Sequence, residues 1–190
     1  VRIVDLKHGK LLGKHNWQNA AAAYVISTEF GCDSKLVSEA LLEYSGLPHR
    51  LEKIAEISGV KFINDSKATN LNAAANALAI YKNIYWIAGG KSKEEDLNSI
   101  AHLFVNIRGA FLIGDSAEVF GRILYGTVPI TYCENLDNAV TNAFNAAKGS
   151  GLTDPVVLLS PACASFDQFS DFEERGDVFR YNVELISENL

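Results

Sequence analysis

The chain has 190 residues, of which 48% are hydrophobic and 21% charged, and its 17 basic and 23 acidic residues give a net charge of −6. These values are typical of one globular domain, or of one domain with part of another, that needs no disulfide or metal to hold its core. The acidic balance argues against a nucleic acid or an acidic membrane surface as the main partner, because both attract clustered Lys and Arg. The sequence has no apolar run long enough for a membrane span and no signal segment at its start.

Two features of the composition concern the origin of the chain. It begins with Val1 and contains no Met, which favours a processed chain or a piece of a longer protein. Its three cysteines, Cys32, Cys133 and Cys163, are far apart and form no CxxC pair, so neither a zinc ribbon nor a disulfide framework is expected. Such thiols favour the reducing cytoplasm as the setting of the protein.

The first part of the chain predicts two short strands and two helices. The strands are expected at residues 2–6 and 11–12. Asn16 is a favourable N-cap for a helix that should stop at Gly31, where glycine can adopt a left-handed conformation. A second helix is expected from Asp33, as its cap, to Ser45.

After residue 48 strands and helices alternate. Residues 54–57 and 60–63 flank Ser58 and Gly59, a pair typical of a hairpin turn. Further strands are expected at 84–88, 110–113, 128–132 and 156–159, and helices at 71–81, 96–106, 116–124, 135–147 and 172–187. Short apolar strands separated by helices predict an α/β, Rossmann-like fold, with a mostly parallel sheet covered by helices on both faces.

This change of pattern predicts a domain boundary close to Leu47. Residues 47–190 contain the elements of a complete α/β domain. Residues 1–46 contain too few elements for a core of their own. We therefore expect them to be the end of another domain whose beginning lies upstream.

Ligands bind open α/β sheets beyond the carboxyl ends of the strands, so the segments that follow the strands are the first candidates for a site. After Ile63, Lys67 and Thr69 are two residues apart in a segment expected to be extended, so both side chains would face an anion together. The N-terminus of the next helix adds free N–H groups. The plainer alternative is a solvated Lys and a Thr that caps the helix.

The segment at residues 89–93 resembles the end of a P-loop. The full pattern requires glycine at position 85, which is occupied by Tyr85. Gly89 and Gly90 still allow a ligand to approach the backbone, and Lys93 supplies a positive charge. A surface turn with solvated lysines is the alternative.

A long loop at residues 160–172 follows the last strand. Ser165 is a candidate hydrogen-bonding group for a ligand, and Phe166 and Phe172 are candidates for packing on its apolar part. The alternative is that the aromatic residues anchor the loop to the core. No histidine follows Cys163 at a spacing typical of cysteine enzymes, so this residue is expected to be a packed, inert thiol.

Two further candidates concern a nucleotide. Asn16 and Asn19 are three residues apart on one helix face, and a side-chain amide offers the donor and acceptor that match the edge of adenine. Arg50 could donate a forked pair of hydrogen bonds to phosphate or ribose oxygens. Helix capping by Asn16 and an ordinary surface arginine are the alternatives. The four histidines have no metal-ligand spacing.

Three groups of segments, in order along the chain, together resemble the Mur ligase family. They are LGKHNWQNA at 12–20, then GLPHR at 46–50 with INDSKATN at 63–70, and then LSPACASFDQF at 159–169 with FEERGD at 172–177. The runs NDSKATN and SPACAS are the most specific of these. The resemblance extends over essentially the whole chain.

The resemblance implies a part of a three-domain, ATP-dependent ligase of peptidoglycan synthesis that joins D-glutamate to UDP-N-acetylmuramoyl-L-alanine through an acyl phosphate. Residues 1–46 would end the central ATP-binding domain, and residues 47–190 would form the C-terminal domain. The residues implied to bind ATP are Asn16, Asn19, Arg50 and Asp65. The residues implied to bind D-glutamate are Lys67, Thr69, Lys93, Ser165, Phe166 and Phe172. Two lysines suit a ligand with two carboxylates, whereas an Asp at position 65 could equally cap the next helix.

The resemblance also implies what this chain lacks. The P-loop, the magnesium ligands and the modified lysine of the family would lie upstream of Val1, so the chain would contain no catalytic residue and no metal ligand and would be inactive alone. ATP and Mg²⁺ would serve the intact enzyme and would not bind tightly to this chain. The expected partners are UDP-N-acetylmuramoyl-L-alanine, D-glutamate, ATP and the missing domains, in the bacterial cytoplasm, without nucleic acid or a membrane span.

Other readings remain open at this point. One is a different amide ligase of the Mur or folylpolyglutamate synthase type, although such relatives do not usually carry the NDSKAT run. Another is a non-catalytic α/β binding module. An ordinary nucleotide-binding Rossmann domain is the third, and the absence of a GxGxxG fingerprint argues against it.

Overall fold

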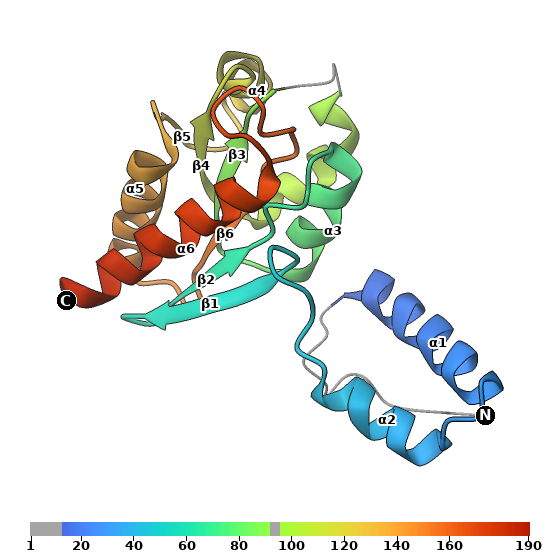
Figure 1. Ribbon diagram of the computed structural model, residues 1–190. Helices are drawn as coiled ribbons and strands as arrows, with labels where there is room; N and C mark the ends of the chain where they lie inside the picture. The colour runs from blue at the N-terminus through green and yellow to red at the C-terminus, as the bar shows by residue number, and fades with distance from the viewer. Residues whose placement is uncertain (1–12, 92–95) are drawn as a thin grey trace. The chain divides into compact units, whose positions relative to one another are not determined.

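The computed structural model describes residues 13–91 and 96–190 (Figure 1). The chain forms two compact units, residues 1–47 and 48–190. Each unit is described by itself. The two short strands expected at residues 2–6 and 11–12 lie outside the described residues.

The first helix of the first unit is α1 (Lys14–Glu29). It begins two residues before Asn16, with Gly13 at the N-cap, so the expectation that Asn16 caps this helix is wrong. The helix ends as expected, because Gly31 adopts a left-handed conformation with φ of 89°. The N–H of Cys32 donates back to the last helical turn at 3.0 Å, which completes a Schellman motif.

The second helix is α2 (Ser34–Glu43). Its cap is Asp33, as expected, whose carboxylate accepts hydrogen bonds from the N–H groups of Lys35 and Leu36 at 2.9 and 3.0 Å. The helix ends two residues before Ser45, the position expected from the sequence.

The second unit contains every strand and helix that the sequence predicts after residue 48. In chain order these are β1 (Glu52–Ile57), β2 (Val60–Asn64), α3 (Leu71–Ile80), β3 (Ile84–Gly89), η2 (Leu97–Asn106), β4 (Ile107–Ile113), α4 (Ala117–Leu124), β5 (Ile130–Tyr132), α5 (Leu136–Gly149), β6 (Val156–Leu159) and α6 (Phe172–Glu188). The segment η2 is a 3₁₀ helix. Strands β1 and β4 begin two and three residues earlier than expected, at Glu52 and Ile107, and β5 begins two residues later, at Ile130.

The six strands form one sheet in the order β1-β2-β6-β3-β4-β5. Only the β1–β2 pair is antiparallel, so the expected α/β fold with a mostly parallel sheet is confirmed. Ser58 and Gly59 connect β1 to β2 with φ of 51° and 78°, the left-handed pair of a type I′ hairpin turn. The last strand, β6, lies between β2 and β3, so the loops that follow β2 and β6 are neighbours.

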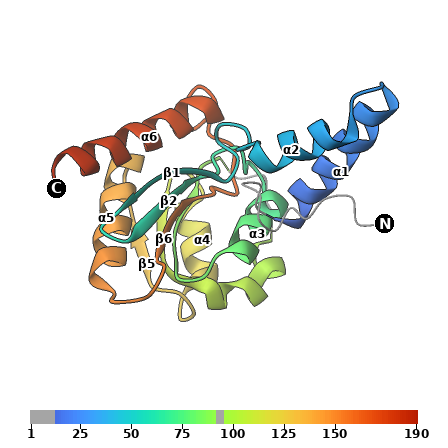
Figure 2. The ribbon, with the colours of Figure 1, turned by 90° about the horizontal axis from the view of Figure 1, so that it is seen from below.

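The sheet is covered on both faces (Figures 1 and 2). Helices α3, η2 and α4 pack on one face, and α5 and α6 pack on the other. The central strand β3 is buried at all six positions. Trp86 faces the core formed with α3, η2 and α4, whereas Tyr85 and Ile87 face the core formed with α5 and α6. This alternation is the two-residue period of a strand. Within the described ranges, no helix combines the length and hydrophobicity that crossing a membrane requires.

Candidate functional site

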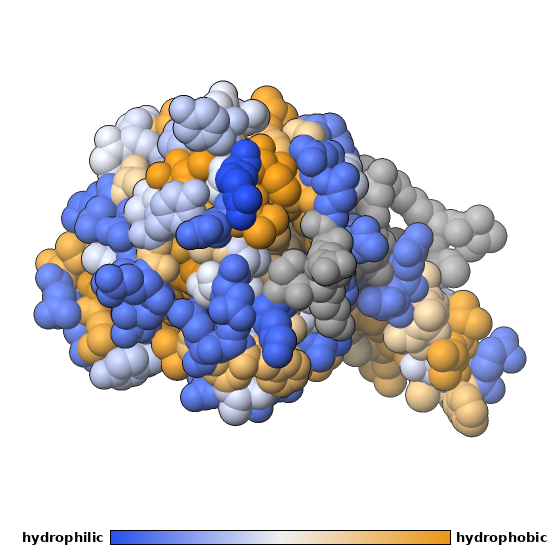
Figure 3. Space-filling model, turned by 90° about the horizontal axis from the view of Figure 1, so that it is seen from above, coloured by the Kyte–Doolittle hydropathy of each residue, from blue (hydrophilic) through white to orange (hydrophobic). Residues whose placement is uncertain are grey.

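Four loops meet beyond the carboxyl ends of the parallel strands. They are residues 64–70 after β2, 89–91 after β3, 114–116 after β4 and 160–171 after β6. Backbone hydrogen bonds join them, from Asp65 N to Leu159 O (2.7 Å), Gly89 N to Pro161 O (2.9 Å), Lys91 N to Ala164 O (2.9 Å) and Ser116 N to Gly90 O (3.0 Å). Figure 3 looks onto this end of the sheet and shows hydrophilic and hydrophobic side chains intermingled. This is where parallel α/β sheets bind ligands.

Gly89 and Gly90 allow these loops to approach one another. Both residues have positive φ, 119° and 131°. A Cβ on Gly89 would collide with the carbonyl of Ile113, and one on Gly90 would collide with the carbonyl of Ala164. From the sequence, the two glycines were expected to admit a ligand, but the group that they admit is the neighbouring backbone.

Arg175, in the first turn of α6, links the loop after β2 to the loop after β6. Its side chain is buried and donates to Ser66 Oγ (2.9 Å), Ser66 O (2.8 Å) and Cys163 O (3.1 Å). Burial lowers the pKa of Arg175 to about 10, against the opposing electrostatic effects of Cys163 and Asp167, so the guanidinium is charged at neutral pH. No local sequence pattern indicates this role of Arg175, because its acceptors lie 109 and 12 residues away in the chain.

The loop after β2 is a turn, so the expectation that Lys67 and Thr69 lie in an extended segment is wrong. The N–H of Thr69 donates to the carbonyl of Lys67 at 2.8 Å. The N–H of Ala68 also donates to the carbonyl of Asp65 at 2.9 Å, and the side-chain oxygen of Asn64 accepts a hydrogen bond from the N–H of Ser66 at 3.1 Å. The N-cap of α3 is Asn70, not Thr69 or Asp65. Lys67 and Thr69 are both half-buried.

The turn places Lys67 beside Phe172. The Lys67 ammonium lies over the face of the Phe172 ring, 3.7 Å from its centroid. The same ring meets the imidazole of His49 edge-on, with centroids 6.1 Å apart. Two residues that were predicted from different loops to share a site are therefore in contact. Lys93 lies outside the described residues.

The loop after β6 holds Ser165 and Phe166. Ser165 is buried, and its carbonyl accepts hydrogen bonds from the N–H groups of Gln168 and Phe169 at 3.1 and 2.9 Å. Phe169 packs against the core, whereas Phe166 is 67% exposed, so only part of the aromatic set anchors the loop. Cys163 is buried with its Sγ 3.3 Å from the hydroxyl of Ser116, as expected of a packed thiol.

Asp65 is buried between the segment that precedes β1 and the loop after β6. Its carboxylate accepts hydrogen bonds from the N–H of Leu51 at 3.1 Å and from the hydroxyl of Ser160 at 2.8 Å. Burial raises the pKa of Asp65 to about 7, against the opposing effect of these two bonds and of the Arg50 charge. Arg50 is itself exposed.

His49 and Asn64 form a buried pair that the sequence analysis did not identify. The Asn64 amide donates to the carbonyl of Gly176 at 3.0 Å and lies 3.1 Å from Nδ1 of His49. His49 Nε2 faces Asp177 at 3.7 Å. Gly176 is required here, because a Cβ would collide with the imidazole. The spacing of the histidines in the sequence does not indicate that His49 pairs with Asn64.

In the first unit, Asn16 and Asn19 lie three residues apart in α1 and therefore share a helix face. The side chain of Asn19 is exposed and that of Asn16 is half-buried. Their assignment to adenine remains a prediction.

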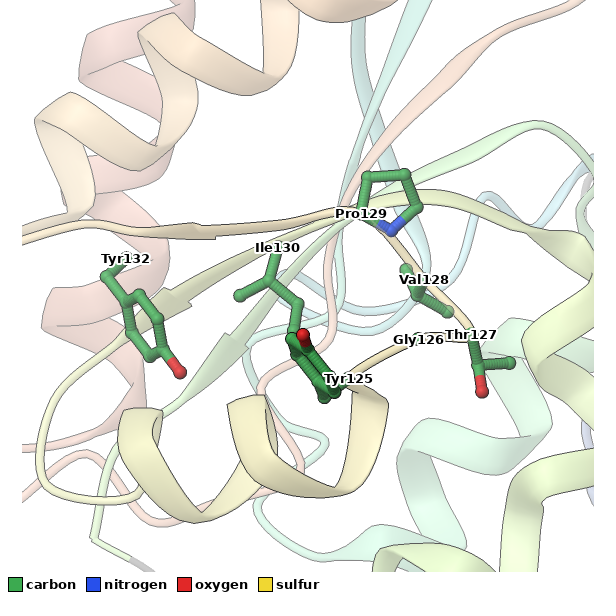
Figure 4. A pocket seen from close by; sticks show the side chains of 7 residues that line it. All are labelled: Tyr125, Gly126, Thr127, Val128, Pro129, Ile130 and Tyr132. Carbon is green, nitrogen blue, oxygen red and sulfur yellow. The ribbon is translucent and has the colours of Figure 1, made fainter.

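A groove lies at another part of the second unit. It is lined by Tyr125, Gly126, Thr127, Val128, Pro129, Ile130 and Tyr132, in and before the edge strand β5 (Figure 4). Strands β3 and β4 separate it from the loops that follow β2 and β6. In the described part of the chain, no three His, Cys, Asp or Glu residues are grouped so as to hold a metal ion.

The fold and the joined loops define an α/β domain of the class that binds small molecules at the carboxyl ends of a parallel sheet. Residues 49–163 match the family profile described as "Mur ligase, glutamate ligase domain". The chain therefore belongs to the Mur ligase family.

Relatives extend this match over most of the chain. It is 54% identical over 170 residues to the UDP-N-acetylmuramoylalanine--D-glutamate ligase of Rhodospirillum rubrum, covering 90% of this chain and 36% of that protein. It is 46% identical over 187 residues to the ligase of the same name from Paramagnetospirillum magneticum, covering 98% and 41%. The chain thus spans well under half of the length of these relatives.

Solved structures agree on the fold. The UDP-N-acetylmuramate-alanine ligase of Thermotoga maritima has a TM-score of 0.65 at 18% identity, covering 96% of this chain and 40% of that one. A bifunctional folylpolyglutamate synthase/dihydrofolate synthase from Yersinia pestis has a TM-score of 0.58 at 18% identity, covering 85% and 37%. At such identities the likeness concerns the fold alone.

Proposed function

We propose that this chain is the D-glutamate-binding part of an ATP-dependent ligase that joins D-glutamate to UDP-N-acetylmuramoyl-L-alanine in peptidoglycan synthesis. The observation that carries the proposal is the contact between Lys67 and Phe172, in a chain that is 43–54% identical over 170–187 residues to ligases named for this reaction. The second unit would be the C-terminal domain, and residues 1–46 would be the end of the central domain.

D-Glutamate would bind at the joined loops. Its two carboxylates need cations and hydroxyl donors, and the proposed set provides both kinds. The residues are Lys67, Thr69, Lys93, Ser165, Phe166 and Phe172. Because the Phe166 ring is 67% exposed, we assign its main chain rather than its ring to the ligand. The burial of Arg175 beneath these loops supports a site that is formed before the ligand arrives.

ATP is the second ligand that we propose for the intact ligase. Asn16 and Asn19 would read adenine, and Arg50 and Asp65 would lie beside the ribose and phosphates. The described residues do not fit a magnesium site, so we derive no step through Mg²⁺ in this chain. Mg²⁺ and UDP-N-acetylmuramoyl-L-alanine would be held by the upstream domains of the ligase.

The bacterial cytoplasm is the proposed location, because ATP and the nucleotide-linked substrate would be used there. Cys32 and Cys133 are free thiols, which suits a reducing compartment.

A chimeric ligase tests the proposal. The part of the Rhodospirillum rubrum ligase that precedes the matched region is joined to this chain, and amide formation is measured with UDP-N-acetylmuramoyl-L-alanine and ATP. We expect ligation with D-glutamate and little with L-glutamate or diaminopimelate. An active chimera that prefers another amino acid would refute the assignment of D-glutamate.

Lys67→Ala is the informative variant of this chimera. Loss of a charged hydrogen bond to a carboxylate should raise the KM for D-glutamate roughly ten- to a hundredfold. Lys148→Ala is the matched control, because Lys148 also lies near an aromatic ring, 5.6 Å from the centroid of Phe144, but on α5. An unchanged KM in Lys67→Ala would remove Lys67 from the proposed site.

A further inference from the structure

The Lys67 side chain is held by a ring and not by a carboxylate. Its Nζ lies 3.7 Å from the centroid of Phe172, well inside the range of about 6 Å for cation–π attraction. Within the described part of the chain, none of the ion pairs involves Lys67. The cation is therefore ordered without being neutralised.

Buried hydrogen bonds fix the backbones on both sides of this contact. The hydroxyl of Ser66 donates to the carbonyl of Phe172 at 2.8 Å and accepts from Arg175 Nε at 2.9 Å. The N–H of Lys67 donates to the carbonyl of His49 at 3.0 Å. The position of the ring relative to Lys67 thus follows from the framework of the fold.

The ring itself is also restrained. The imidazole of His49 packs against it at an interplanar angle of 79°, and His49 is buried and bonded to Asn64. Phe172 is the first residue of α6, whose N-cap Asp171 accepts a hydrogen bond from Glu174 N at 2.7 Å. A ring so held presents a fixed face to the ammonium.

A lysine is a compact cation on a long flexible stem, and ordering that stem opposes ligand binding. A ring face restrains the stem while leaving N–H donors of the ammonium free for an anion. A carboxylate partner would restrain it equally but would compete with the ligand. An aromatic platform therefore suits a lysine whose task is to bind a carboxylate.

We propose that Phe172 is a positioning residue that holds the Lys67 ammonium ready for a carboxylate of the amino-acid substrate, and that the ring acts through Lys67 and not by contact with the ligand. The inference rests on the proposed function for the identity of that substrate. It narrows the place of Phe172 in the proposed D-glutamate site, because the side chain would serve that site through Lys67 and not by the packing on the ligand that was expected from the sequence.

The first test is spectroscopic and needs no substrate. In NMR spectra of this chain, the ε-methylene protons of Lys67 should be shifted upfield by the ring. We expect Phe172→Leu to abolish this shift, and Phe172→Tyr to retain it because tyrosine provides an equivalent face. Tyr181→Leu, an exposed aromatic on the same helix, is the control and should leave the shift unchanged. A shift that persists in Phe172→Leu would overturn the contact.

The second test uses the chimera described above. We expect Phe172→Leu to raise the KM for D-glutamate roughly three- to fivefold, with kcat within about twofold, and Phe172→Tyr to restore the KM. A lost NMR shift with an unchanged KM would overturn the positioning role. A wild-type chimera that does not respond to D-glutamate, while the Lys67 shift still depends on Phe172, would overturn the proposed function and leave the contact standing.

Discussion

Arg175 is buried and hydrogen-bonds to two loops of the candidate site. It satisfies two acceptors on Ser66 and one on Cys163, so it couples the loop after β2 to the loop after β6. A guanidinium can do this because its five N–H donors are fixed in one plane.

Arg175→Lys should therefore be destabilising even though it keeps the charge. An ammonium cannot reach all three acceptors, and we expect a loss of about 2–4 kcal/mol in the free energy of unfolding. Urea unfolding measures this loss. Arg122→Lys, at an exposed site, is the control and should change stability by less than about 0.5 kcal/mol. Equal effects of the two substitutions would show that the buried bonds contribute little.

Asp65 gives the fold a specific pH dependence. Its pKa is about 7 in the folded chain against an ordinary value of 3.8, chiefly because it is buried. Between these values the folded form holds a proton that the unfolded form has released. The stabilising contribution is therefore fully present below pH 3.8 and is lost as the pH rises through 7.

We expect the free energy of unfolding to fall by about 2–3 kcal/mol more between pH 5 and pH 8 in the wild type than in Asp65→Asn. Asparagine cannot titrate, and comparing the two pH values within each protein removes the effect of the altered hydrogen bond to Ser160. Urea unfolding at both pH values checks this. The same pH dependence in both proteins would mean that Asp65 is ionised throughout.

The loop that follows β3 depends on the close approach of backbones. Gly90→Ala would place a Cβ against the carbonyl of Ala164 at a φ of 131°. We expect a loss of about 2–5 kcal/mol from backbone strain and overpacking together. Gly149→Ala, in a helix with nothing within 4 Å of the new Cβ, should instead stabilise by about 0.5–1 kcal/mol. Thermal unfolding of the pair distinguishes them, and a neutral Gly90→Ala would show that the loops separate easily.

Elements with a strong local pattern were predictable. Strand β6 matches its expected range, and the hairpin at Ser58 and Gly59 forms as its residue types require. The turn at Lys67 was not predicted, because it is formed by irregular hydrogen bonds, among them one from the N–H of Ser66 to the side-chain oxygen of Asn64. The 3₁₀ geometry of η2 was also missed, since its apolar spacing resembles that of an α-helix.

The two units of the molecule differ in how much they bury. Among residues 16–47 only Ala20 is buried, and helices of this length are marginal without tertiary packing. The second unit has a double-sided core around β3. In hydrogen exchange we expect the amides of α1 and α2 to exchange quickly and those of β3 and α5 to be strongly protected. Comparable protection in both units would contradict this difference in local stability.

Local residue types were enough to predict the succession of strands and helices, the hairpin, the sheet class and the family, because hydrophobic period, turn chemistry and short motifs act over a few residues. The motifs also indicated Lys67 and Phe172 as candidate site residues, but they did not predict the contact between them. That contact, the burial of Asp65 and the clamp formed by Arg175 join residues as many as 109 positions apart. They form because β6 lies between β2 and β3 and brings loops that are distant in the sequence side by side. Burial then raises the pKa of Asp65 and makes Arg175 a structural link between these loops.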